Sequence, residues 1–169
     1  MSYVSILIHC VWSTKDRAPL LKNPHYRYEL FAHIRKYSKS KGILTDYIGG
    51  FTNHVHLLLF LKPGQSLAEI EKLIKGESSH WYSQMKYGHL EWQDDYFAIS
   101  VSPDRLETVR RYIRKQEEHH KKYSFGEEYE SFLKILHKEG LLYCYKVWLY
   151  TNTICHVSYP ICHVEHSMP

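Results

Sequence analysis

Apolar residues recur along the chain in two rhythms, which separate predicted strands from predicted helices. Short runs rich in β-branched and aromatic residues predict strands, and apolar residues spaced three and four apart predict amphipathic helices. Ser66 followed by Glu69 is typical of a helix start, and Pro103 suits a first helical turn. The pattern predicts strands over 5–12, 43–48, 52–61 and 96–102, and helices over 24–41, 66–87, 103–122 and 127–138.

The order of these elements predicts the fold class. A strand, a helix, two strands, a helix and a strand follow one another, and two further helices come after them. This is the βαββαβ order of ferredoxin-like folds. We therefore expect an α+β protein in which a four-stranded antiparallel sheet carries helices on one face, with additional C-terminal helices.

The composition of the chain changes after Gly140. Residues 141–169 contain only two charged side chains, Lys146 and Glu165. We therefore predict one functional domain over residues 1–140 and a divergent apolar tail over 141–169 that is not a separate domain. The cysteines and histidines of this tail are irregularly spaced, which does not favour a zinc site.

The charge balance narrows the choice of partners only slightly. The formal net charge is +4, which suits either a polyanion such as nucleic acid or a mildly basic domain of another kind. No run approaches the ~20 apolar residues of a spanning helix, and the N-terminus lacks the basic region of a signal peptide. Four cysteines without a disulfide framework indicate a reducing compartment, so we expect a cytoplasmic protein with no membrane attachment.

His54 and His56 stand two residues apart in the strand predicted over 52–61. The strand period of two places both imidazoles on one face and Val55 on the other. Two neighbouring histidines can hold a divalent metal ion. The chain has 13 histidines, so a pair of polar residues at a strand end is the alternative interpretation.

Tyr112 and Gln116 lie one turn apart on the helix predicted over 103–122, so their side chains project together. A tyrosine hydroxyl, with a pKa near 10, needs a metal or a base beside it to act as a nucleophile. The carbonyl oxygen of a glutamine suits Mg²⁺ or Mn²⁺. The alternative is an aromatic residue at the core boundary, and the basic residues around the pair would then form a solvated helix face.

Together these features resemble the single-tyrosine HUH transposases of bacterial insertion sequences, which include the REP-associated tyrosine transposases. The segment Gly49-Gly-Phe-Thr-Asn-His54-Val-His56 resembles the family's strand of two histidines around a hydrophobic residue. Tyr112 and Gln116 resemble its Tyr-x-x-x-Gln helix. Residues 11–17, 73–79 and 92–102 resemble its first strand, second helix and final strand, so that the likeness covers about residues 3–140 in order.

The resemblance implies a transposase that cleaves and rejoins single-stranded, hairpin-bearing DNA. It implies that Tyr112 attacks the scissile phosphate to form a 5′-phosphotyrosine, and that His54, His56 and Gln116 hold Mg²⁺ or Mn²⁺. His119 or His120 could take the place of Gln116 as a ligand. It also implies a homodimer that needs no nucleotide cofactor. The candidate DNA contacts are basic or polar residues near these elements: Lys15, Arg17, Lys75, Ser78, Arg105, Arg111, Arg114 and Lys115.

Two other functions would use the same residues. A catalytically inactive or domesticated relative would bind single-stranded or hairpin DNA without cleaving it, since a fold alone does not fix an activity. A replication-initiation or conjugative nickase would use the same HUH chemistry, but proteins of that kind are usually longer and carry further domains.

Overall fold

The computed structural model describes residues 4–138 of the chain. Its strands are β1 (Ile6–Ser13), β2 (Leu44–Gly50), β3 (His54–Leu61) and β4 (Phe97–Ser100). Its helices are α1 (Pro24–Ser40), α2 (Leu67–Gln84), α3 (Leu106–Arg114), α4 (Gln116–His119) and α5 (Phe125–Lys138), with short 3-10 turns η1 (Lys15–Arg17) and η2 (Pro103–Arg105). The chain divides into two units after Glu128, and the fold and the site described below belong to the first. The tail predicted over 141–169 lies outside the described residues.

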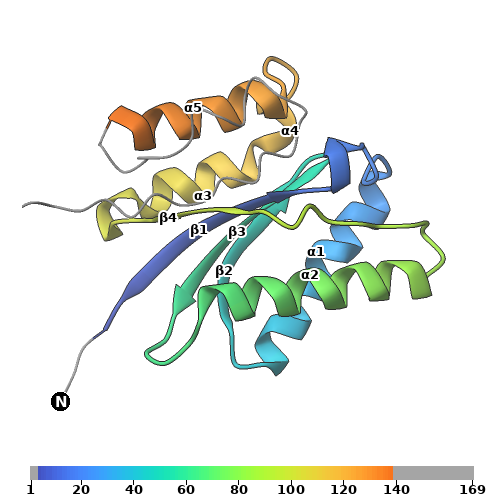
Figure 1. Cartoon of the computed structure of the whole chain (residues 1–169), viewed down its shortest axis with the longest axis horizontal. Coiled ribbons are helices and arrows are strands. Elements are labelled where there is room, and N and C mark those ends of the chain that lie inside the picture. The colour runs from blue at the N-terminus through green and yellow to red at the C-terminus, as the bar shows by residue number, and fades with distance from the viewer. Residues whose placement is uncertain (1–3, 139–169) are drawn as a thin grey trace, which may run out of the picture. The chain divides into compact units, whose positions relative to one another are not determined.

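The four strands form one antiparallel sheet in the order β2-β3-β1-β4, which confirms the predicted α+β class and βαββαβ order (Figure 1). β3 and β1 are the two central strands. Their register pairs Ser13 with His54 and Val11 with His56. The two histidines therefore lie near one end of the middle of the sheet.

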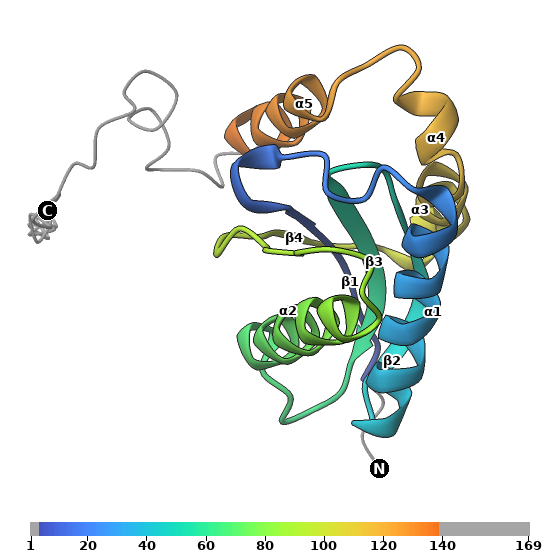
Figure 2. The same ribbon diagram turned by 90° about the vertical axis from the view of Figure 1, so that its right-hand side faces the viewer.

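Alternation along β3 gives the sheet two buried faces. The side chains that join α1 and α2 in the main core are Val55, Leu57 and Leu59. Leu58 points to the other face, where it packs with Leu7 of β1 and Ile113 of α3. Figures 1 and 2 show α1 and α2 on one side of the sheet and α3 on the other. The histidine pair shares the Leu58 face, because it lies at the same parity along the strand.

Local signals in the sequence set several element boundaries. The side chain of Asn23 accepts a hydrogen bond from the backbone N–H of His25 (3.0 Å), and Pro24 opens α1 as a first helical residue. Ser66 caps α2 in the same way through the N–H of Glu69. At Gly49 of β2, a Cβ atom would lie 2.7 Å from the backbone oxygen of Ile113, so only glycine lets α3 approach β2 this closely.

The continuous helix predicted over 103–122 is wrong. The structure divides this segment into η2, α3 and α4, with a break at Lys115 (φ −95°, ψ 18°). Gln116, just after the break, hydrogen-bonds to His54, and Glu117 pairs with Arg27 of α1. These tertiary contacts hold α4 in place, and they outweigh the local preference for an unbroken helix.

Candidate functional site

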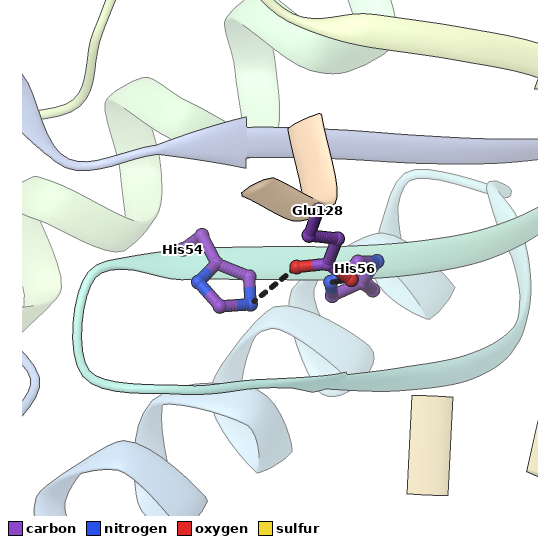
Figure 3. Close-up of side chains that lie close together, drawn as sticks. All are labelled: His54, His56 and Glu128. Atoms are coloured by element: carbon purple, nitrogen blue, oxygen red, sulfur yellow. Dashed lines mark ion pairs between the residues drawn. The ribbon is translucent and has the colours of Figure 1, made fainter. Parts of the chain in front are cut away.

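Two imidazoles and one carboxylate meet on the sheet face that α3 covers. His54 and His56 project from β3 and are fully buried. Glu128, in the first turn of α5, reaches both: its Oε2 lies 3.8 Å from His54 Nε2 and its Oε1 lies 3.4 Å from His56 Nε2 (Figure 3). One ligand atom from each residue lies within 4.8 Å of the other two. Two imidazole nitrogens and a carboxylate oxygen suit a divalent metal, so the three residues fit a metal site.

Gln116 and His120 extend this cluster on the side of His54. Gln116 Oε1 lies 3.2 Å from His54 Nε2, and its amide nitrogen donates to Glu128 Oε1 (3.2 Å). His120 Nε2 lies 3.1 Å from the same nitrogen of His54 and 3.2 Å from Glu128 Oε2. His119 is more distant, at 4.0 Å from Glu128. Either Gln116 or His120 is therefore placed to provide a fourth metal ligand, beside His54, His56 and Glu128.

Tyr112 faces the cluster from α3. Its hydroxyl donates a hydrogen bond to Glu128 Oε1, and its ring meets the ring of His56 edge-on at 5.7 Å between centroids. The structure thus brings Tyr112 and Gln116 next to His54 and His56, although at least 56 positions separate the first pair from the second in the sequence. A hydroxyl, two imidazoles and a carboxylate in this arrangement can place a nucleophile beside a bound cation.

His9 of β1 contacts the Nδ1 side of the His56 ring, and it was not among the residues predicted from the sequence. Its Nε2 lies 3.0 Å from His56 Nδ1, and the two buried rings stack at 5.2 Å. For His56 to bind a cation through Nε2, its Nδ1 must carry the proton and donate it to His9 Nε2. A partner of this kind fixes the tautomer and the ring orientation of a metal-binding histidine. The one available signal was that His9 shares a strand face with Leu7 and Val11, two positions away on either side.

Glu128 was also missed, because nothing in the local sequence distinguishes it from the glutamates around it. It follows Glu127 and precedes Glu130 in a helix that is amphipathic overall. Glu127 instead accepts hydrogen bonds from the backbone and the hydroxyl of Ser124. Only the position of the first turn of α5 next to β3 shows which of these carboxylates is buried in the site.

Burial controls the protonation of the cluster. It lowers the pKa of His9 to about 4, and burial together with the charge of His120 lowers the pKa of His54 to about 3. Burial also holds the pKa of His56 well below its ordinary value, and raises the pKa of Glu128 to about 8. Neutral imidazoles offer the lone pairs that a metal needs. A cation between these groups would favour the ionised form of Glu128.

Of the predicted DNA contacts, Arg17 adjoins the cluster through Phe125. Its guanidinium stands 5.7 Å from the centre of the Phe125 ring, and that ring stacks on His54 at 4.3 Å. Lys15, next to it in η1, is half-buried. The remaining exposed basic residues lie on η2, on α3 and at the break after it: Arg105, Arg111, Arg114 and Lys115.

Lys75 and Ser78 lie elsewhere, on α2 across the sheet from the histidine pair. The Lys75 ammonium donates to the backbone carbonyls of residues 93, 94 and 95 at 3.0–3.2 Å. Ser78 is buried, and its hydroxyl accepts a hydrogen bond from the indole of Trp92 (3.0 Å). In this conformation both side chains hold the segment before β4 against α2, and the structure does not bring them to the cluster.

Within residues 4–138, no helix is both long enough and apolar enough to cross a membrane.

Comparison with known proteins identifies relatives of the same kind. The ISDra2 transposase TnpA of Deinococcus radiodurans is 27% identical over 115 residues, which cover 64% of this chain and 81% of the relative. A crystal structure of a transposase from the same species has a TM-score of 0.54 at 23% identity, covering 69% of this chain and 95% of that one. The structure of a REP-associated tyrosine transposase bound to a REP hairpin has a TM-score of 0.54 at 15% identity, and the match covers 71% of this chain and 72% of that one. The two solved structures share the fold.

The family described as "Transposase IS200 like" matches residues 2–116. The match runs from the N-terminus through β1 to the first residue of α4, and it covers more than half of the chain. It includes Tyr112, Gln116 and the histidine pair, whereas Glu128 lies beyond it. The chain therefore belongs to the IS200-like transposases, a family of single-tyrosine HUH proteins related to the REP-associated tyrosine transposases.

Proposed function

We propose that this chain cleaves and rejoins single-stranded, hairpin-bearing DNA through a covalent 5′-phosphotyrosine at Tyr112, assisted by Mg²⁺ or Mn²⁺. The observation that carries the proposal is the position of the Tyr112 hydroxyl. It hydrogen-bonds to the same carboxylate, Glu128, that lies 3.4 Å from His56 Nε2. A nucleophile and a candidate metal position are thereby adjacent. The REP hairpin bound by one structural relative supports a hairpin as the substrate.

The mechanism divides the work between the tyrosine and the ligand set. His54, His56 and Glu128 would hold the cation, with Gln116 or His120 as a further ligand. A cation held there would supply charge stabilisation for the scissile phosphate and for the departing 3′-oxygen. Tyr112 Oη attacks the phosphorus in line with that oxygen, which gives a phosphotyrosine and a free 3′-OH. Its hydrogen bond to Glu128, in the ionised form that a cation favours, gives the hydroxyl proton a path away from the nucleophile, and the departing 3′-oxygen takes up a proton to become the 3′-OH.

Strand joining is the reverse reaction on a second strand. A 3′-OH attacks the phosphotyrosine and Tyr112 leaves, so neither water nor a nucleotide cofactor is consumed. Among the predicted DNA contacts, Lys15, Arg17, Arg105, Arg111, Arg114 and Lys115 would hold phosphates near the site. The family resemblance further leads us to propose a cytoplasmic homodimer, and sedimentation of the purified chain would detect a monomer instead.

A covalent-adduct assay tests the proposal. Labelled single strands from both flanks of the gene are incubated with Mn²⁺, with Mg²⁺ or with chelator, and denaturing gels reveal protein-bound DNA. We expect a metal-dependent adduct that Tyr112→Phe abolishes without loss of DNA binding. Tyr37→Phe on α1, away from the cluster, is the matched control and keeps the adduct. An adduct that persists in Tyr112→Phe would assign the nucleophile elsewhere.

The same assay distinguishes the proposed transposase from the second candidate function, which is DNA binding without cleavage. A catalytically inactive relative would bind the hairpin equally well with and without chelator, and would form no adduct on either flank. That result would place the function of this chain in DNA binding alone.

A further inference from the structure

A groove of about 450 Å³ runs outside the edge strand β2, between α1 and the junction of α3 with α4. Tyr28 and Arg35 of α1 line one side of it, Tyr47 of β2 lines the floor, and Arg114 and Gln116 line the other side. Its volume is within the range of about 300–1,000 Å³ that is usual for ligand pockets. The groove is thus large enough to receive part of a ligand that extends further along the surface.

The groove borders on the candidate metal site through Gln116. Gln116 is buried in it, and Gln116 Oε1 lies 3.2 Å from His54 Nε2. Gly49 and Gly50, at the end of β2, also line the groove and add no side chains to obstruct it. A molecule lying in the groove would therefore have one end next to residues that could hold a cation.

The charge of the groove is positive. Among the described residues, the guanidinium groups of Arg35 and Arg114 have no carboxylate within ion-pair distance. The acid that lines the groove, Glu117, is already paired with the buried Arg27 and accepts a hydrogen bond from the Tyr28 hydroxyl (2.9 Å). The groove therefore favours an anionic occupant such as a phosphodiester chain.

Two tyrosine rings stand beside these positive charges. Tyr28 is 57% exposed. Tyr47 is half-buried, and it holds the Arg114 guanidinium 5.5 Å from its ring centre while its hydroxyl accepts from Arg114 Nε (3.1 Å). Aromatic rings next to arginines are the means by which proteins bind single-stranded nucleic acid, because unpaired bases present faces on which rings stack. A duplex keeps those faces covered.

We propose that this groove holds the single-stranded segment that leads into the scissile phosphate, with Arg35 and Arg114 contacting phosphates and Tyr28 and Tyr47 stacking on bases. The inference rests on the proposed function for its substrate, and it adds the route by which that substrate reaches the site. Tyr28, Arg35 and Tyr47 were not among the DNA contacts predicted from the sequence.

The test compares two labelled oligonucleotides by fluorescence anisotropy, with the full chain as the binder. One is a hairpin from a flank of the gene with its single-stranded extensions, and the other is the same hairpin without them. Arg35→Gln is expected to weaken binding of the extended oligonucleotide. It should also make the negative slope of log affinity against log salt shallower by about 0.7, the contribution of one phosphate contact. Lys36→Gln, a neighbouring change outside the groove, is the matched control and leaves both the affinity and the slope unchanged.

A second pair of variants tests stacking. Tyr28→Leu removes the ring and is expected to weaken binding of the extended oligonucleotide about fivefold or more, whereas Tyr28→Phe keeps the ring and most of the affinity. Neither variant should alter binding of the hairpin without extensions. Circular dichroism of each variant verifies that the fold is intact.

Three results would overturn the inference. The wild-type chain could bind both oligonucleotides equally, the Arg35 and Lys36 variants could behave alike, or Tyr28→Leu could weaken both oligonucleotides to the same extent. Adduct formation at Tyr112 is scored separately on the same preparations. If the adduct forms but the groove variants bind normally, the proposed DNA route is refuted and the proposed function stands. If binding depends on the groove residues but no adduct forms, the DNA route is supported and the proposed catalytic function is refuted.

Discussion

Glu71 provides a test of the packing between α2 and the sheet that is independent of DNA. It is a carboxylate on the core-facing side of α2, 1% exposed, between the buried Ile70 and Ile74. Burial raises its pKa from 4.5 to about 7, although the nearby Lys75 ammonium and the Cys10 thiol partly oppose this shift. Glu71→Gln keeps the size and polarity of the side chain and removes its ability to ionise.

The sign and size of the effect follow from the two pKa values. Between pH 4.5 and about 7, the folded chain holds a proton on Glu71 that the unfolded chain has released, so the free energy of unfolding falls as the pH rises through this window. The loss is complete above the folded-state pKa. At about 1.4 kcal/mol for each pH unit between the two values, the ionised carboxylate costs about 3 kcal/mol. The glutamine variant escapes this cost.

Urea unfolding of the wild type and of Glu71→Gln, at several pH values from 4.5 to 8.5, measures this difference. We expect nearly equal stabilities at the acidic end and an advantage of about 3 kcal/mol for the variant above pH 7. Other titrating groups cancel in the comparison because both proteins contain them. Glu69→Gln, an exposed position on the same helix, is the matched control and should parallel the wild type. A constant difference between wild type and Glu71→Gln at all pH values would refute the reasoning.

Substitutions at two further positions, His9 and Gly49, test the candidate site and its framework. His9→Leu removes the acceptor for His56 Nδ1 and should weaken Mn²⁺ binding, measured by calorimetry, about 10- to 100-fold. His9→Gln retains an acceptor and should keep most of the affinity. Equal binding by the wild type and both variants would contradict a positioning role for His9. Gly49→Ala places a Cβ atom against the backbone of Ile113 and should cost about 1–3 kcal/mol in urea unfolding; an unchanged midpoint would contradict the close approach of α3.

The parts of the fold that depend on neighbouring residues were predictable from the sequence. The strand period of two placed both imidazoles on one face and Val55 on the other, and the structure confirms this division, with Val55 in the main core. Helix starts at Pro24 and Ser66 were marked by residues whose side chains or ring geometry act within one turn. Signals of this kind act over a few residues, so they can be recognised without knowledge of the tertiary structure.

The features that the sequence did not indicate all depend on contacts between distant segments. The break at Lys115 follows from what Gln116 touches on β3, 62 residues away. His9 acquires its place from the β1–β3 register, which brings it within 3.0 Å of a residue 47 positions later. Glu128 differs from other glutamates of α5 only in what lies beside it. The grouping of Tyr112 with the histidines was expected from a family resemblance, and the distances between them came from the structure alone.

The histidines of the candidate site and its tyrosine and glutamine lie on elements that differ in local stability. The imidazoles belong to β1 and β3, the central strands, whose backbone hydrogen bonds open only when most of the sheet comes apart. The tyrosine and glutamine belong to two short helices joined by a break, and such segments can open alone at a fraction of the free energy of global unfolding. The ligand pair can therefore persist as a rigid platform through fluctuations that carry the nucleophile away from it and back.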